Sequence, residues 1–424
     1  MKKGTLIVSL LVSLLAMPCA LFSQGKSEKN ATGVNSAAPV TELQLWHRWS
    51  GTNEEKLNQI VALFEEANPD VKVTVTSKPG EYMELLQKMI ANLAAGKNPP
   101  DLFVGGYNLL NYIGSELKPN EVGTLAPSSD SYQVFVDRFD PAIWALGNMD
   151  ARQIGVPFAL SNIVLFYNAD LFRQAGLTES DVPSTWDDVF RIGKFIKEKT
   201  GKYAVGIQSV DTWPDLGLMF SNGGRLLTDD NSKVAFNNPE SEEAIAMWQR
   251  LHNEGLHPIC TDDELYADFV AGNVAMYDSS CMKLAGMQKA ANFDLEVAKT
   301  PAFGLKPRAL PAGGAAIINF SKDKARKDAS WRFIEFATSQ KAMEIFSQSG
   351  YLCVTKDKVP VNKGQEAAYS QIPNAVPWIC WPGGSIGLEM ERRYHDVRMQ
   401  IIQENVDTKE AFDKLVPELN ALLK

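Results

Sequence analysis

The residues of this chain that are best suited to chemistry are aromatic and small polar side chains. Trp378 and Trp381 lie in a segment that ends Pro382-Gly383-Gly384, so they do not belong to a regular apolar stripe. Aromatic side chains in a loop on a rigid scaffold are often binding residues, although one of the two can instead fill a hydrophobic gap. Aromatic faces beside a few polar groups suit a ligand with flat C–H faces and a rim of hydroxyls. This stretch predicts a binding site for a carbohydrate-like small molecule.

Catalytic and metal-binding patterns are sparse. The chain has 4 histidines among 424 residues, and its sequence contains no nucleophile elbow, zinc motif or phosphate-cradling loop. His252, His257 and Cys260 lie close together, but their irregular spacing and the lack of a matching second half favour structural or solvent-facing roles. We therefore expect no catalytic residue, no metal and no cofactor. A secreted carbohydrate-acting hydrolase that uses two carboxylates remains the alternative.

The N-terminus has the pattern of an export signal. Lys2 and Lys3 precede an apolar run from Leu6 to Phe22, and residues 1–18 are expected to be a signal peptide. No later stretch approaches the roughly 18 unbroken apolar residues of a membrane span. The sequence therefore predicts an exported protein, periplasmic in a bacterium, that contacts a membrane only through an anchor.

Cys19 is the candidate for that anchor. The segment Leu15-Ala16-Met17-Pro18-Cys19 resembles a bacterial lipoprotein box, in which the cysteine becomes the lipidated N-terminus, although Met17 and Pro18 depart from the preferred small residues. Residues 19–40, rich in Lys, Ser, Asn and Ala, are expected to form a flexible tether. Cleavage near Ser23 or Gly25 would instead remove the cysteine.

Length, charge and cysteine content limit the other possibilities. A chain of 424 residues exceeds the roughly 250–300 at which one core stops growing, so we expect two lobes. The net charge of -9 offers no basic face for a phosphate backbone, which argues against nucleic acid as a partner. Beyond Cys19, four cysteines permit three disulfide connectivities or free buried thiols: Cys260, Cys281, Cys353 and Cys380.

From Glu42 onward, strand and helix patterns alternate. Apolar residues of period two predict strands at 43–45 and 71–75, and a helix between them is preceded by a capping-box pattern at Thr52 and Glu55. A second series begins with a strand at 163–167. Further helices are expected after Thr185 and near 240–254, 323–348, 386–403 and 408–424, the last kinked at Pro417. The alternation predicts an α/β fold with a largely parallel sheet.

The order of several motifs resembles the extracellular solute-binding proteins (family 1) of bacterial ABC importers, which include maltose- and glycerol-3-phosphate-binding proteins. The resemblance covers nearly all of residues 41–424. Its motifs are Leu45-Trp46-His47, Phe64-Glu65-Glu66-Ala67-Asn68-Pro69, Pro100-Asp101-Leu102, Gly155-Val156-Pro157-Phe158, Leu165-Phe166-Tyr167-Asn168, Ala175-Gly176-Leu177, Thr185-Trp186, the stretch 269–276, Gly313-Gly314-Ala315 and Ser349-Gly350-Tyr351-Leu352.

This resemblance implies a two-lobed, periplasmic-binding-protein-like (type II) α/β fold with hinge crossings and a ligand cleft between the lobes. Lobe one would take residues 41–156 and 301–350, and lobe two would take 157–300 and 351–424. The expected partners are a small solute and the ABC permease subunits, and the protein is expected to be a monomer. A hinge would let the lobes close on the solute. A surface adhesin is the further alternative.

The candidate ligand residues come partly from their place at strand ends and crossings and partly from the resemblance. They are Trp46, His47, Tyr82, Tyr107, Ser161, Trp213, Ser279, Ser280, Gly313, Gly314, Tyr351, Trp378, Trp381 and Glu391. Glu391 falls where the glycerol-3-phosphate branch has a site arginine, so a bare phosphate would meet a negative charge there. The expected solute is a sugar or a glycerol-phosphate-type polyol. Tryptophans beside a carboxylate also suit a quaternary ammonium, as in the glycerophosphodiester glycerophosphocholine.

Overall fold

The structure is a computed structural model that describes residues 40–209 and 211–423. The expected signal peptide 1–18, Cys19 and the tether up to residue 39 lie outside the described residues. Among these described residues, no helix is both long enough and apolar enough to cross a membrane.

The first sheet has five strands in the order β2-β1-β3-β12-β6. Its strands are β1 (Thr41–His47), β2 (Val71–Ser77), β3 (Leu102–Gly106), β6 (Gly155–Ser161) and β12 (Gly313–Asn319). β1 runs parallel to β2 and β3, as the sequence predicts, whereas β12 runs antiparallel to both β3 and β6. All residues of β3, β6 and β12 are buried, as expected for strands covered on both faces.

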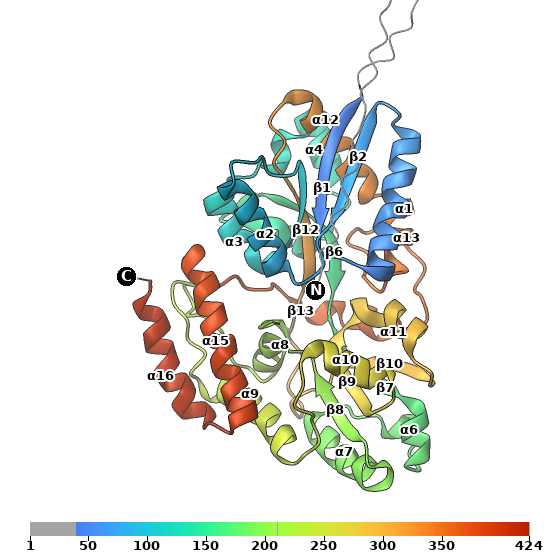
Figure 1. Cartoon of the computed structure of the whole chain (residues 1–424), viewed down its shortest axis with the longest axis vertical. Coiled ribbons are helices and arrows are strands. Elements are labelled where there is room, and N and C mark those ends of the chain that lie inside the picture. The colour runs from blue at the N-terminus through green and yellow to red at the C-terminus, as the bar shows by residue number, and fades with distance from the viewer. Residues whose placement is uncertain (1–39, 210, 424) are drawn as a thin grey trace, which may run out of the picture. The chain divides into compact units, whose positions relative to one another are not determined.

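Helices cover both faces of this sheet (Figure 1). They are α1 (Gly51–Ala67), α2 (Tyr82–Ala94), α3 (Leu110–Tyr112), α4 (Ser129–Val136), α5 (Pro141–Trp144), α12 (Lys324–Ala337) and α13 (Gln340–Ser347). α1 buries the predicted apolar face: Leu57, Ile60, Val61 and Phe64. The short strands β4 (Asn148–Met149) and β5 (Arg152–Gln153) form a separate hairpin.

The second sheet has four strands in the order β10-β7-β9-β8. They are β7 (Ile163–Asn168), β8 (Tyr203–Ile207), β9 (Val274–Ser280) and β10 (Leu295–Lys299). α6 (Ala169–Gln174), α7 (Trp186–Thr200), α10 (Asp262–Val270) and α11 (Leu284–Ala290) accompany it. α7 begins at a capping box between Thr185 and Asp188 and ends at Gly201, whose φ of 70° suits a residue without a side chain.

A helical layer packs beside the second sheet (Figure 1). It contains α8 (Trp213–Ser221), α9 (Pro239–Asn253), α15 (Ser385–Glu404) and α16 (Thr408–Ala421), which contact one another. The fully buried Arg398 of α15 lies 3.2 Å from Asp215 of α8 and contacts the face of Trp248 on α9. The remaining elements are α14 (Glu366–Ser370) and the paired strands β11 (Leu310–Pro311) and β13 (Ala375–Val376).

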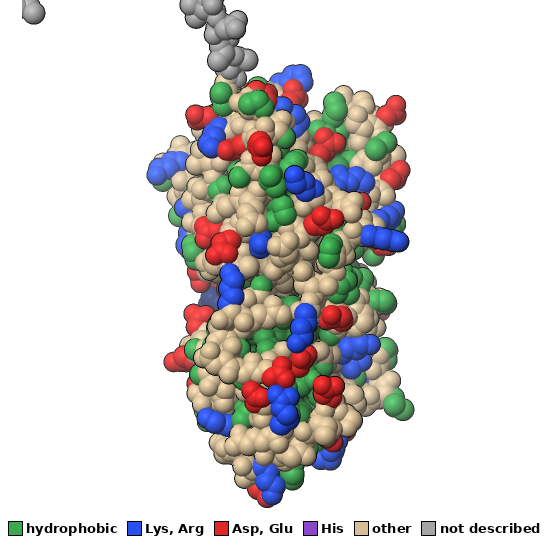
Figure 2. All heavy atoms as spheres, turned by 90° about the vertical axis from the view of Figure 1, so that its right-hand side faces the viewer, with side chains coloured by type: hydrophobic (Ala, Val, Ile, Leu, Met, Phe, Trp, Pro, Cys, Tyr) green, Lys and Arg blue, Asp and Glu red, His purple; other side chains and the backbone are tan. Residues whose placement is uncertain are grey.

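The face shown in Figure 2 carries Lys and Arg side chains interspersed with Asp and Glu. Exposed charges of opposite sign pair with one another elsewhere in the described chain as well, as Lys289 does with Glu55 at 3.4 Å. The sequence left open whether the four cysteines of the folded part form disulfides or remain free thiols. In the structure all four are free thiols: Cys260, Cys281, Cys353 and Cys380.

Three local expectations require correction. The helix predicted at 323–348 is two helices, because Thr338 ends α12 and the Ser339 side chain caps α13. α1 begins at Gly51 after Ser50, so Thr52 and Glu55 lie inside the helix and do not form its capping box. The expected lobe boundary at residue 156 falls inside β6, which pairs with β12 from Gly155 to Ser161.

Asp101 ties three segments of the first sheet together. Its side chain, 5% exposed, accepts hydrogen bonds from the Gln44 N–H and the Ser321 hydroxyl, each at 3.0 Å. Asp101→Ala leaves the Gln44 N–H without a partner and removes one of the two acceptors near the Ser321 hydroxyl, so the free energy of unfolding should fall by about 1–3 kcal/mol. Urea unfolding measures the loss.

Asp328→Ala is the matched control, because it removes an exposed carboxylate that pairs with Lys324. It should change the free energy of unfolding by less than about 0.5 kcal/mol. Equal losses for both variants would contradict the role assigned to Asp101.

Candidate functional site

The two sheets are joined where β6 leads into β7 through a single residue, Asn162. On one side of this junction, Ser161 pairs with Gly313 at the start of β12. On the other side, Ile163 pairs with Ser280 at the end of β9. The two ladders therefore bring the ends of four strands, and with them two serines and a glycine, to one place between the sheets.

A central cavity lies at this convergence. Its volume is about 30 Å³, room for one or two water molecules. Eight of the sequence-predicted residues line it: Tyr82, Ser161, Trp213, Ser280, Gly313, Gly314, Tyr351 and Trp378. Arg48, Glu81, Gln208, Asp211 and Met282 complete the lining.

Tyr351 is the hub of the hydrogen bonds on one side of the central cavity. Its hydroxyl accepts the Trp49 indole N–H at 3.0 Å and donates to the Met282 sulfur at 3.1 Å. The hydroxyl of Tyr82 lies 3.5 Å away, and the ring of Tyr351 stacks on Phe346 at a centroid distance of 5.1 Å. These contacts leave the hydroxyl little freedom to reorient.

Two tryptophans also line the central cavity. The rings of Trp213 and Trp378 lie 6.1 Å apart, and the Trp213 indole N–H donates to the Pro311 carbonyl at 2.8 Å. Gly313 lies directly beneath: a Cβ there would lie 2.7 Å from both the Ser161 hydroxyl and the Trp213 ring. Only glycine therefore fits at this position without a shift of its neighbours.

Two larger cavities adjoin the central one. The first, about 690 Å³, shares Arg48, Glu81 and Met282 with it, and the second, about 440 Å³, shares Glu81, Tyr82 and Asp211. Both volumes lie in the range of small-molecule sites. The 440 Å³ cavity lies between α2 and α15 and includes Glu391.

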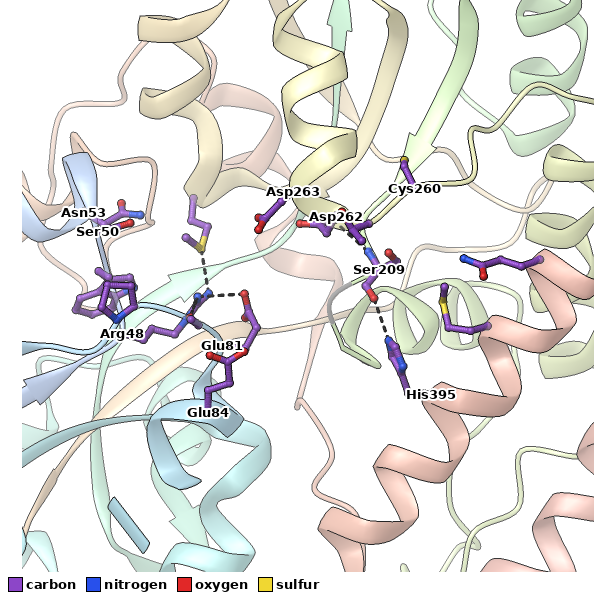
Figure 3. A pocket seen from close by; sticks show the side chains of 17 residues that line it. Arg48, Ser50, Asn53, Glu81, Glu84, Ser209, Cys260, Asp262, Asp263 and His395 are labelled. Carbon is purple, nitrogen blue, oxygen red and sulfur yellow. Dashed lines mark hydrogen bonds and ion pairs between the residues drawn. The ribbon is translucent and has the colours of Figure 1, made fainter. Parts of the chain in front are cut away.

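Figure 3 shows the 690 Å³ cavity. The Arg48 guanidinium donates to Glu81 at 3.3 Å and to the Gly80 carbonyl at 2.7 Å, and it lies 4.4 Å from the centre of the Tyr82 ring. Asp262, which pairs with Lys283 at 2.8 Å, and Asp263 lie across the cavity.

The remaining predicted residues do not line these three cavities. His47 is fully buried and accepts the Trp49 backbone N–H at 3.1 Å, and burial lowers its pKa to about 4. Tyr107, Ser279 and Trp381 are buried among other partners. The Tyr107 hydroxyl donates to the Ala159 carbonyl, and the Ser279 hydroxyl donates to Gln208. The Trp381 ring packs on Phe236 and Tyr394. Trp46 is half-buried, with the Lys78 ammonium over its ring.

Sequence reasoning did not single out Arg48, Glu81 or Gln208 as lining residues, or Asn108 of the 440 Å³ cavity. A signal was present for two of them, because Arg48 follows the Trp46-His47 motif and Glu81 precedes Tyr82. Gln208 has no such neighbour. It is held by Ser279, a predicted residue, whose hydroxyl donates to the Gln208 amide oxygen at 2.6 Å.

Carboxyl groups inside the site have raised pKa values. Burial raises the pKa of Glu391 to about 7; hydrogen bonds from Thr212 and Asn108 oppose this shift, and the charge of Asp215 adds to it. Burial, then the charge of Glu81, raises the pKa of Asp211 well above its usual range. At neutral pH Glu391 is therefore close to the point at which it ionises.

The chain is similar to known proteins in both sequence and structure. A family model described as bacterial extracellular solute-binding protein matches residues 49–344. The sn-glycerol-3-phosphate-binding periplasmic protein UgpB of Escherichia coli (strain K12) is 26% identical over 423 residues, covering 92% of this chain and 94% of that protein.

Solved structures share the fold. UgpB from Mycobacterium tuberculosis in complex with glycerophosphocholine superposes with a TM-score of 0.78 at 22% identity, covering 90% of this chain and 98% of that one. The cyclic alpha-maltosyl-1,6-maltose binding protein from Arthrobacter globiformis gives a TM-score of 0.74 at 24% identity, covering 91% and 99%. The two-lobed α/β fold predicted from the sequence is confirmed.

Asp278 of β9 should make stability depend on pH. It is 2% exposed, and burial raises its pKa from 3.8 to about 7, although Thr300 donates to it at 2.6 Å. Because the folded state holds the proton more tightly, stability is fully present below about pH 4 and is lost as pH rises to about 7. The loss is on the order of 4 kcal/mol.

Asp278→Asn keeps the acceptor for Thr300 and removes the ionisation. Urea unfolding at about pH 4 and pH 8 should therefore show a smaller drop in stability for the variant than for the parent protein. Asp229→Asn, at a side chain that is 97% exposed, should leave the drop unchanged. If the parent and Asp278→Asn lose equal stability, the assignment is wrong.

Proposed function

Because the chain belongs to the bacterial extracellular solute-binding protein family, we propose that it is the substrate-binding component of an ABC importer. It captures a sugar or a glycerophosphate-type polyol between its two sheets and presents it to permease subunits. The E. coli relative binds sn-glycerol 3-phosphate, and the similar structures include a glycerophosphocholine complex and a cyclic alpha-maltosyl-1,6-maltose binding protein, which supports this range of solutes.

The observation that carries the proposal is the convergence of eight predicted residues on the central cavity. The indole faces of Trp213 and Trp378 suit the C–H faces of a polyol, and the hydroxyls of Ser161 and Ser280 suit its oxygens. We propose these eight residues, together with Glu391 in the adjoining 440 Å³ cavity, as the ligand residues. Trp46, His47, Tyr107, Ser279 and Trp381 act one layer behind them through packing.

The size of the central cavity implies movement. A volume of about 30 Å³ is too small for a sugar, so a solute enters only if the side chains or the sheets move apart. The single-residue link at Asn162 suits such a hinge, because a few residues between packed elements absorb the change in φ and ψ. We propose lobes that follow the two sheets, with crossings near residues 162, 300–312 and 348–352.

The protein binds its solute without changing it. The alternative of a hydrolase requires two carboxylates across a scissile bond. Glu81 and Asp211 lie on the same cavity, but Glu81 is engaged by Arg48. Solute recovered unchanged after incubation and denaturation supports binding alone, whereas cleavage products would establish catalysis.

We propose that the exported protein is held at the membrane through lipid on Cys19. The sequence Leu15-Ala16-Met17-Pro18-Cys19 supports it, and the E. coli relative is periplasmic. Palmitate labelling in a bacterial host should be lost in Cys19→Ala. A mature protein that begins near Ser23 or Gly25 would exclude the anchor.

Gly313→Ala tests the solute site directly. The added methyl group meets the Ser161 hydroxyl and the Trp213 ring at 2.7 Å, so it pushes the indole out of place. Titration calorimetry with the solute that co-purifies, identified by mass spectrometry, should show affinity reduced at least tenfold. Without such a solute, sn-glycerol 3-phosphate, glycerophosphocholine and maltose serve as probes.

Gly123→Ala is the control, because its Cβ would meet only the Tyr132 ring at an ordinary 3.6 Å. It should bind like the parent. Thermal unfolding of Gly313→Ala checks that the fold survives, and Trp213→Phe provides a second variant of the same wall. Full affinity in both site variants would overturn the proposed location.

A further inference from the structure

We propose that the 440 Å³ cavity between α2 and α15, here called the acceptor cavity, binds a protonated primary or secondary amine carried by the solute. This inference rests on the proposed function and deepens it by naming a chemical group of the solute. The cavity shares Glu81, Tyr82 and Asp211 with the central cavity, so one solute can reach both. Its lining residues that matter here are Asn108, Asp211 and Glu391.

The acceptors of this cavity either lack a donor or accept only from uncharged groups; Asp211, for example, accepts the Trp213 backbone N–H at 2.9 Å. The Oδ1 atom of Asn108, in a residue 9% exposed, has no hydrogen-bond partner in the structure. Glu391, 7% exposed, receives a hydrogen bond from the neutral Thr212 hydroxyl at 2.7 Å. Among the ion pairs within 40–209 and 211–423, none includes Asp211 or Glu391. Buried acceptors of this kind call for a donor from outside the chain.

The cations nearest to the acceptor cavity are already engaged. Arg48 donates to Gly80 and Glu81 and covers one face of Tyr82. Arg392, which lines the cavity, pairs with Glu389 at 3.0 Å and with Asp396 at 2.7 Å. A positive charge brought by the solute would therefore pair with Asp211 and Glu391 without displacing an existing ion pair.

The geometry favours an ammonium with N–H groups over a quaternary one. The quaternary ammonium of the sequence analysis required tryptophans beside the carboxylate. In the structure Trp213 and Trp378 line the central cavity beside Glu81 and Asp211, whereas Glu391 lies in the acceptor cavity, whose described lining contains no tryptophan. The acceptor cavity thus offers oxygens in place of an indole cage, and oxygens bind N–H donors.

Two matched pairs of probes test the inference by calorimetry at about pH 8. They are sn-glycero-3-phosphoethanolamine against sn-glycerol 3-phosphate, and 6-amino-6-deoxyglucose against glucose. In the pair that the protein accepts, the amine should bind at least tenfold more tightly. Glu391→Gln, which keeps the acceptor for Thr212, should lower this preference at least fivefold.

Glu404→Gln is the control, because it makes the same charge change at the exposed far end of α15. It should leave every affinity unchanged. Asn108→Asp, a second variant in case Glu391→Gln fails to fold, should raise the preference for the amine. Equal binding within the accepted pair, an unaltered preference in Glu391→Gln, or tighter binding of glycerophosphocholine than of its ethanolamine counterpart would overturn the inference.

The chemistry of the co-purifying solute separates amine recognition in the acceptor cavity from solute binding as such. If no probe binds, the co-purifying solute is treated with dansyl chloride, which labels primary and secondary amines. A labelled solute supports the inference. An unlabelled solute overturns it and leaves the solute-binding function standing, whereas a protein with no co-purifying solute and no binding overturns both.

Discussion

The passage of the backbone from β6 through Asn162 into β7 is the constraint on which the site depends. Both strands are wholly buried, and each is held in a ladder of its own sheet. Asn162 holds the junction: its carbonyl accepts the Cys281 N–H at 3.0 Å, and its amide donates to the Ala368 carbonyl at 2.8 Å. A register shift of one residue in either ladder would turn Ser161 or Ser280 away from the central cavity. The fold and the site are therefore specified by the same pairings.

Around this junction the protein keeps polar groups where they weaken the fold. Asp211 and Glu391 are held where burial opposes ionisation, and Asn108 has an acceptor without a donor. A buried acceptor without a partner costs about 1–3 kcal/mol. The surrounding aromatic packing, such as Phe346 on Tyr351 and Phe236 on Tyr394, offsets this cost. Groups that lower stability yet face a cavity are typical of binding sites, because a ligand can complete them.

Much of the site was predictable because small polar residues at strand ends are easily recognised. Ser161, Ser280 and Gly313 end or begin strands, and those strands pair with one another. Aromatic residues were less predictable. Trp46 and Trp49 are near neighbours in sequence, but Trp46 is half-buried under Lys78 whereas Trp49 is buried and donates to Tyr351. The side on which such a ring lies depends on pleat and local turn geometry, which composition does not specify.

Periodicity and motif order are properties of the chain alone, so the alternation of strands and helices, the two-lobed α/β class and the family follow from the amino-acid residues without coordinates. Which residues share a cavity depends on the folded arrangement. It placed Trp378 with Trp213 but separated Trp381, three residues later, into the packing of Phe236. It also put Glu391 opposite α2, apart from the tryptophans. Such groupings join segments hundreds of residues apart, and they follow from the pairing of whole strands and helices, which no local pattern encodes.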